Sequence, residues 1–176
     1  IRIDKTAGTV SLASGLTLNG AGQDLRVVAG SIDPGAHTVT LSGGGIVSVE
    51  GGSYRATNTI VGNLAVNNGG RLLFDVDGTG AGQYDRLTVT GNVSAGADSH
   101  LVFDVADFAT GGTAASVLAY GSRSGSFSSV DLQGNAAAYA ATALYDSPPG
   151  ALSVHFNRGP SISGATPPNT SATRSA

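Results

Sequence analysis

The sequence predicts an all-β protein of the parallel β-solenoid type, with a β-sandwich as the alternative. Three observations predict this fold: short runs that alternate apolar and polar residues, glycine-rich turns between the runs, and an internal repeat that aligns without gaps. Alternation with a period of two is typical of strands, and self-similarity with a period of about 20 to 50 residues is typical of stacked coils.

The predicted strands are rich in Thr, Ser and Val, whose side chains pack well on a pleated surface. They include residues 9–12, 16–18, 37–41, 46–49 and 86–90. Turns separate these runs at Asn19-Gly20, Asp33-Pro34-Gly35, Gly43-Gly44-Gly45, Gly51-Gly52, Asn68-Gly69-Gly70 and Gly111-Gly112. Glycine accepts positive φ without a steric penalty, and Pro-Gly favours a turn. The Ala-rich segment 135–144 fits either a short helix or another strand.

The repeat is clearest between residues 62–76 and residues 91–105. Gly-Asn opens both copies and Phe-Asp-Val closes both, and the two copies align without a gap. Because each coil of a solenoid stacks its strands on the next coil, such spacing favours the solenoid over the sandwich. We therefore expect residues 1–158 to form a β-solenoid repeat domain.

Composition limits the classes of function that the chain can serve. Charged residues make up 12% of the 176 residues and the formal net charge is -3. Nucleic-acid binding requires clustered positive charge, so we expect no nucleic-acid partner. No apolar run approaches the roughly 20 residues of a membrane span, so we expect no membrane insertion. Eleven of the twelve acidic residues are Asp, and Asp favours turns over helix surfaces.

The composition changes at residue 159. Residues 159–176 are rich in Pro, Ser and Thr and resemble a linker. We expect this C-terminal tail to be held either by its own domain or by a neighbouring subunit, which in the second case it would clasp as an added strand. The residues that we assign to this contact are Gly159, Pro160, Ile162, Pro167 and Pro168.

The segment from Gly80 to Phe156 resembles a unit of bacterial surface β-helix proteins, namely autotransporter passengers and two-partner-secretion exoproteins of the filamentous-haemagglutinin-like kind. The resemblance rests on residues 82–91, which read Gly-Gln-Tyr-Asp-Arg-Leu-Thr-Val-Thr-Gly, and on residues 101–105, 117–120, 125–127 and 151–154. It implies a right-handed parallel β-helix and a location outside the cell or on the bacterial surface. It says nothing specific about a ligand.

Two groups of carboxylates are candidates for chemistry. Asp75, Asp77 and Asp85 surround a glycine-rich loop that could bind calcium, but the loop has Thr79 and Arg86 where further acidic ligands would be expected. An ordinary turn between strands is the preferred interpretation. Asp75 and Asp104 occupy equivalent repeat positions and could act as a glycosidase pair, but a structural role explains them more simply.

The remaining candidates for chemistry are isolated in the sequence. His37, His100 and His155 lack partners at metal-ligand spacing, so we expect surface or turn roles for them. We expect no enzymatic activity, no metal and no cofactor.

The leading hypothesis is a structural or adhesive segment of a secreted bacterial surface protein, which contacts a surface carbohydrate or a host or cell receptor. One alternative is a self-assembling subunit of an extracellular filament or sheath that associates through solenoid ends and the C-terminal tail. A weaker alternative is a polysaccharide-active enzyme.

Overall fold

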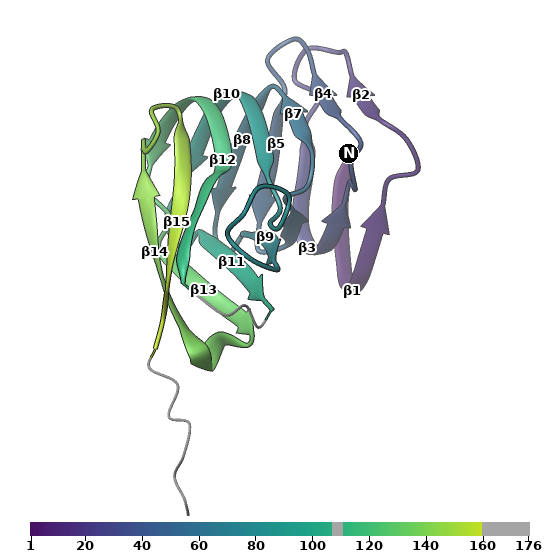
Figure 1. Cartoon of the computed structure of the whole chain (residues 1–176). Helices are drawn as coiled ribbons and strands as arrows, with labels where there is room; N and C mark the ends of the chain where they lie inside the picture. The colour runs from purple at the N-terminus through teal and green to yellow at the C-terminus, as the bar shows by residue number, and fades with distance from the viewer. Residues whose placement is uncertain (107–110, 160–176) are drawn as a thin grey trace, which may run out of the picture.

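The chain folds into one large, strongly curled β-sheet, seen in a computed structural model that describes residues 1–106 and 111–159 (Figure 1). The all-β expectation is confirmed, because the described elements are fifteen strands and one short 3-10 helix. All fifteen strands belong to a single sheet.

The strands follow one another closely along the chain. They are β1 (Arg2–Ser11), β2 (Leu16–Leu18), β3 (Leu25–Asp33), β4 (Val39–Leu41), β5 (Ile46–Glu50), β6 (Ser53–Arg55), β7 (Thr59–Val61), β8 (Asn63–Asn67), β9 (Arg71–Val76), β10 (Leu87–Ala95), β11 (His100–Val105), β12 (Gly112–Gly125), β13 (Ser129–Gly134), β14 (Tyr139–Tyr145) and β15 (Ala151–Arg158), with the 3-10 helix at Ala136–Ala138.

The parallel strand pairs form three ladders. Ladder A joins β1, β3, β5, β8, β10 and β12. Ladder B joins β1, β3, β6, β9, β11 and β13. Ladder C joins β2, β4, β7, β10 and β12. Four strands take part in two ladders each, because the register of their pairing shifts or their partner strand changes along their length. These strands are β1, β3, β10 and β12.

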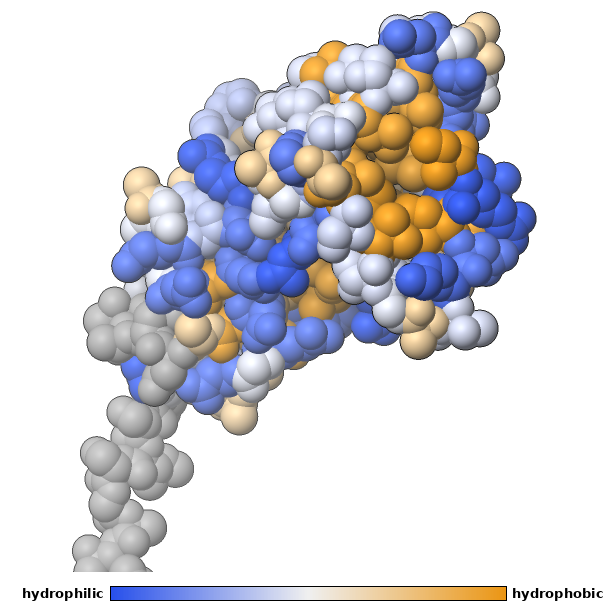
Figure 2. Space-filling model, turned by 90° about the vertical axis from the view of Figure 1, so that its right-hand side faces the viewer, coloured by the Kyte–Doolittle hydropathy of each residue, from blue (hydrophilic) through white to orange (hydrophobic). Residues whose placement is uncertain are grey.

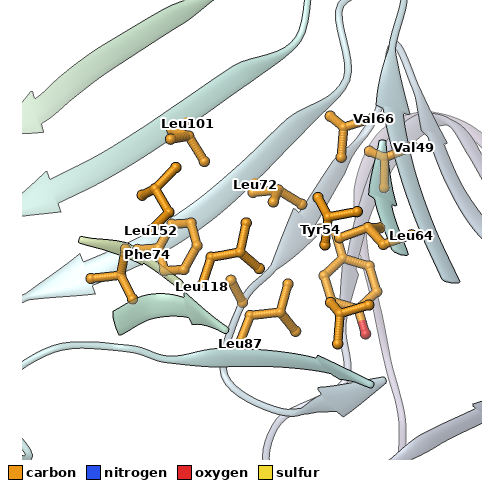
Figure 3. Packing of buried hydrophobic residues seen from close by; sticks show 14 of the residues in the cluster. Val49, Tyr54, Leu64, Val66, Leu72, Phe74, Leu87, Leu101, Leu118 and Leu152 are labelled. Atoms are coloured by element: carbon orange, nitrogen blue, oxygen red, sulfur yellow. The ribbon is translucent and has the colours of Figure 1, made fainter. Parts of the chain in front are cut away.

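Stacked apolar side chains fill the inside of the curl (Figure 3). In ladder A, Val27, Val49 and Val66 lie in register and are fully buried. Ladder B stacks Ile32, Tyr54, Leu72 and Leu101 in the same way. Ladder C stacks Val39, Ile60 and Val89. Burial of such apolar surface is the dominant favourable contribution to folding, at about 25 cal/mol per Å².

The Phe-Asp-Val triplets of the two repeat copies pair with each other. Phe74 pairs with Phe103, Asp75 with Asp104 and Val76 with Val105, which is the same alignment that the sequence comparison gives. Successive side chains of a strand point to opposite faces, so the two phenyl rings lie inside, stacked with centroids 5.0 Å apart, while the two Asp side chains lie outside. The triplet therefore serves both the core and the surface.

The C-terminal part of the sheet changes direction. β15 pairs antiparallel with β12 and with β14, so ladder C ends in an antiparallel layer (Figure 1). The Ala-rich segment 135–144 contributes the 3-10 turn and most of β14, which pairs along its whole length with β15. Strand therefore prevails over helix in this segment, because its backbone groups find partners in β15.

Candidate functional site

The outer side of ladder B carries a row of ionisable and polar side chains. Asp75 on β9 and Asp104 on β11 lie side by side in register, and Gln133 on β13 continues the row. The row borders a hollow of about 500 Å³. It is lined by Arg55, Asp75, Asp77, Asp104, Val105, Ala106, Gly134 and Asn135.

Arg55 supplies the positive charge of this row. It extends from β6 and forms an ion pair with Asp75, whose side chain is 43% exposed. Asp104 is exposed on the neighbouring strand. The two carboxylates that the sequence suggests as a catalytic pair are thus adjacent, but one of them already has a cationic partner. The arrangement is that of a surface ion pair, which contributes about 0–1 kcal/mol to stability.

Asp85 closes the loop that joins β9 to β10. Its carboxylate accepts a hydrogen bond from the Asp75 backbone N–H at 2.8 Å, and its own N–H donates to the Asp75 carbonyl at 2.9 Å. Burial raises the pKa of Asp85, Arg55 opposes this change, and Asp33 and Asp77 add to it. The Asp85 carboxylate is therefore partly desolvated, because its hydrogen bond with the Asp75 N–H holds it against the backbone of β9.

The residues considered for calcium are placed around the same loop, and the carboxylates of Asp75 and Asp85 have other partners. Asp75 pairs with Arg55, Asp85 binds backbone, and the Asp77 N–H donates to the Gln83 carbonyl at 2.7 Å. In residues 1–106 and 111–159, no three His, Asp or Glu side chains are grouped so that they could hold a metal ion. These contacts place the three Asp residues around the loop that joins β9 to β10.

A second polar cluster surrounds His100, which looks isolated in the sequence. Nε2 of His100 lies 2.9 Å from Asp98 Oδ1, and its Nδ1 lies 2.7 Å from Ser129 Oγ and 3.1 Å from Asp131 Oδ2. The Ser129 hydroxyl also lies 2.9 Å from Asp131. Sequence reasoning missed this cluster, although the repeat offset places position 129 beside position 100. Extending the repeat by one more copy would have found it.

The chemistry of the His100 cluster is that of a cross-strand clamp. The imidazole contacts Asp98 through Nε2 and Asp131 through Nδ1, which ties the turn before β11 to the neighbouring β13. Hydrogen bonds that involve charged groups are roughly twice as strong as neutral ones. The cluster lies at the edge of ladder B, where it holds β13 on the stack.

The other two histidines are placed on the surface side of strands or turns. His155 on β15 contacts the Thr113 hydroxyl at 2.9 Å and Asn157 at 3.0 Å, and the His37 carbonyl accepts from Asn58 at 2.9 Å. Of the residues that we assign to self-association, Gly159 is described and its N–H donates to the Ala138 carbonyl at 2.9 Å. Pro160, Ile162, Pro167 and Pro168 lie outside the described residues.

Known proteins do not assign a family to this chain. Comparisons with family models, with curated proteins and with solved structures give no match to this chain. No described helix has the length and apolar character needed to cross a membrane.

Proposed function

We propose that the chain is a non-catalytic structural or adhesive segment of a secreted bacterial surface protein, folded as a right-handed parallel β-helix. The observation that carries this proposal is the set of three parallel ladders with stacked apolar side chains between them. Parallel strands joined by crossovers are right-handed in about 98% of cases, which favours the right-handed coil that the resemblance implies.

Stiffness would follow from this architecture. Each strand of the interior is held by two neighbours, and neighbouring strands lie about 4.8 Å apart along the stack. Several charged side chains form ion pairs between or within coils, including Arg26 with Glu50 and Arg55 with Asp75. A stack of this kind holds surface loops at fixed positions and buries the backbone that a protease needs to reach.

The outer side of ladder B is the best candidate for an adhesive contact. The hollow beside Asp75 and Asp104 combines carboxylates, the Arg55 guanidinium and the Asn135 amide. Such groups donate and accept hydrogen bonds to the hydroxyl groups of a carbohydrate. The ligand class that fits this surface is therefore a surface polysaccharide or the glycan of a receptor.

A binding assay that also follows chain length tests adhesion against catalysis. Beads coated with the folded chain would be mixed with a panel of surface polysaccharides, with beads carrying heat-unfolded chain as the control. We expect retention of one polysaccharide class by the folded chain, reduced retention for Arg55→Gln, and no shortening of the polysaccharide. Shortening that disappears in Asp104→Asn would make the protein an enzyme and contradict the proposal.

Limited proteolysis tests the structural part of the proposal. Trypsin is expected to leave the bonds after Arg55 and Arg71 intact, because Arg55 at the end of β6 and Arg71 at the start of β9 both belong to paired backbone, in which the Ala56 N–H also donates to the Leu73 carbonyl. Rapid cleavage at those two bonds in the native chain would show that the stack is not rigid.

A further inference from the structure

The outer side of ladder C carries a regular array of threonines, which we call the threonine face. Strands β2, β4, β7 and β10 of this ladder follow one another along one side of the curl (Figure 1). Their core residues point inward, so the residues on either side of them point outward. The face consists of Thr17, Thr38, Thr40, Thr59, Val61, Thr88 and Thr90.

One column of the face runs across three coils. Thr59 pairs in parallel register with Thr88. Thr38 directly precedes Val39, and Val39 pairs with Ile60, so Thr38 stands beside Thr59. Because neighbouring strands lie about 4.8 Å apart, the hydroxyl groups of this column recur at that spacing.

The second column lies two residues further along the same strands. Thr17 pairs with Thr40, and Thr40 pairs with Val61. Thr90 comes two residues after Thr88 and so continues this column beside Val61. Residues i and i+2 of a strand are roughly 6.6 Å apart. The two columns therefore form a grid that repeats in two directions.

Most hydroxyl groups of the threonine face are free to bind water. Within residues 1–106 and 111–159, the face makes one side-chain hydrogen bond to protein, in which the Thr90 hydroxyl accepts from the Gly62 N–H at 3.1 Å. The other threonines of the face are exposed or half-buried. A hydroxyl has one donor and two acceptor sites. β-branched side chains are stiff at χ1, so their methyl and hydroxyl groups keep fixed positions.

The partner that fits this face is uncharged and regular. The seven residues of the face, all of them described, include no charged and no aromatic side chain. A single flexible polymer would contact few points of the grid at a time, whereas a crystal surface repeats at fixed spacings and can contact all of them. A crystalline polysaccharide fits less well, because the face offers no aromatic ring for a sugar ring to stack on. The water molecules of ice supply both donors and acceptors at lattice positions and require no charge.

We propose that the threonine face binds the surface of ice crystals. Its hydroxyl groups bind water molecules of the crystal surface, and its methyl groups and Val61 lie in the hollows between those molecules. Groups that are already fixed lose little conformational entropy on binding, so many weak contacts add up. The inference goes beyond the proposed adhesive function and makes no use of the outer side of ladder B.

A hydrophobic area elsewhere on the molecule has to be distinguished from the threonine face. It lies at the end of the stack formed by β1 and β2 and is bordered by hydrophilic residues (Figure 2). Half-buried apolar side chains of this end include Val10, Leu12, Leu16 and Leu18. Adsorption of this apolar end to ice would not depend on a threonine in the middle of ladder C, so substitutions in the two regions separate the two contacts.

Uptake into slowly grown ice tests the proposal. Ice is grown from a dilute solution of the full chain, and the protein in the ice is compared with the protein left in the liquid. We expect the chain to enter the ice and Thr88→Lys to remain in the liquid, because the lysine side chain projects from the grid and its charge holds liquid water. Thr38→Lys, a second change on the face, should behave like Thr88→Lys. Circular dichroism and Tm verify that the variants are folded.

The matched control is the same substitution on another ladder. Thr9 is exposed on β1 in ladder B, beside the apolar end, and we expect Thr9→Lys to enter the ice as the unaltered chain does. Exclusion of the unaltered chain from ice would overturn the proposal. Equal uptake of the chain and of folded Thr88→Lys would do so too, as would a loss of uptake in Thr9→Lys alone, which would place the contact at the apolar end.

Two further measurements separate this inference from its neighbours. Exclusion from ice together with retention on crystalline cellulose that Thr88→Lys abolishes would overturn the proposal, because the face would then bind a polysaccharide. Arg55→Gln, which tests the adhesive contact of ladder B, should leave uptake into ice unchanged. Loss of uptake in Arg55→Gln would contradict the assignment to ladder C, whereas failure to bind any soluble polysaccharide would contradict the adhesive contact and leave the threonine face supported by its own test.

Discussion

The two ends of the curled sheet differ in how they meet solvent. At the N-terminal end, which we call the open end, the half-buried side chains of Val10, Leu16 and Leu18 pack against the core. Among the described residues, the outer edges of β1 and β2 have no partner strand. At the C-terminal end, β15 pairs antiparallel with β12, and β14 pairs with the other edge of β15. We call this layer of β12, β15 and β14 the closed end. The difference shows one way in which a parallel ladder can be terminated: β15 runs antiparallel to β12 and pairs with the edge that ladder C would otherwise leave free.

A cluster of side chains holds the C-terminal layer in place. Arg123 lies 2.9 Å from Asp146 and stacks over the Tyr145 ring at 4.6 Å from its centroid. The Tyr120 hydroxyl donates to Asp146 at 2.8 Å. The hydrogen bond from Arg123, and then that from Tyr120, hold the pKa of Asp146 below its usual value. Burial is the main cause of the raised pKa of Tyr120. No comparable cluster involves the described inward residues of the open end.

The largest expected effect is a difference in unfolding free energy between two variants, each of which truncates one core residue at one end of the sheet. Phe156 on β15 is fully buried, and its ring packs edge-on against the Phe103 ring, with the ring centroids 5.7 Å apart. Phe156→Ala should lower the free energy of unfolding by about 3–5 kcal/mol, because it leaves a cavity in packed surroundings. Ile3→Ala should cost about 2 kcal/mol, at the low end of the range for a buried Ile, because a partner strand flanks Ile3 on one side, that of β3. Chemical denaturation measures both values, and equal losses would remove the distinction.

Removal of one hydroxyl should produce a smaller loss at the closed end. The Tyr145 hydroxyl accepts a hydrogen bond from the Phe127 N–H at 2.9 Å. Tyr145→Phe leaves this largely buried donor unpaired and should cost about 1 kcal/mol. Thr17→Ala on the exposed side of β2 is the matched change at the open end, and we expect it to stay within about 0.5 kcal/mol. Faster exchange of the Phe127 amide in Tyr145→Phe would locate the loss, whereas an unchanged stability would show that Tyr145 does not hold the layer.

Acid should loosen the closed end before it affects the open end. Since the folded-state pKa of Asp146 is depressed, its contribution is present above the unfolded value of 3.8 and is lost as pH falls through the folded-state pKa. Asp146→Asn should therefore lower Tm by about 1–3 °C at pH 7 and leave it unchanged near pH 2. Thermal unfolding at the two pH values measures this. A loss of equal size at both values would mean that ionisation of Asp146 plays no part.

The smallest expected effect is an increase in Tm, opposite in sign to that of Asp146→Asn, and it concerns Asp85 in the loop between β9 and β10. Burial raises the pKa of Asp85, so the stability linked to its protonated form is complete below the unfolded value of 3.8 and is lost as pH rises through the folded-state pKa. Asp85→Asn keeps an oxygen that can accept from the Asp75 N–H and removes the buried charge. It should raise Tm by about 1 °C at pH 7 and by less at pH 3. A lower Tm at pH 7 would show that the attraction of Arg55 outweighs desolvation.

Local patterns predicted the middle of the sheet better than its ends. The repeat offset found between residues 62–76 and 91–105 is also the pairing offset of β8 with β10 and of β9 with β11. The sequence repeat could show this offset because each inward residue of β8 and β9 pairs with the residue at the equivalent repeat position of β10 and β11. The offset is shorter between β5 and β8, where Val47 pairs with Leu64, so the ladder continues there without a matching sequence repeat.

Features that depend on contacts between unlike segments could not be predicted in this way. The antiparallel pairing of β15 with β12 joins Leu118 to Leu152, and alternation alone does not state the direction of a partner strand. The clamp of His100 with Ser129 and Asp131 depends on side chains that differ from those of the previous coil, where Arg71 occupies the place of His100. The adhesive ligand remains a proposal for the same reason, since it depends on outward side chains that no repeat constrains.

Native-state hydrogen exchange of the chain, followed strand by strand, tests the central claim most directly. The three stacked ladders with one open and one closed end predict weak protection in β1 and β2, strong protection from β5 through β11, and protection in β15 that approaches that of the interior. Protection of β1 and β2 equal to that of β8, or a C-terminal layer that exchanges as fast as β1, would contradict the account.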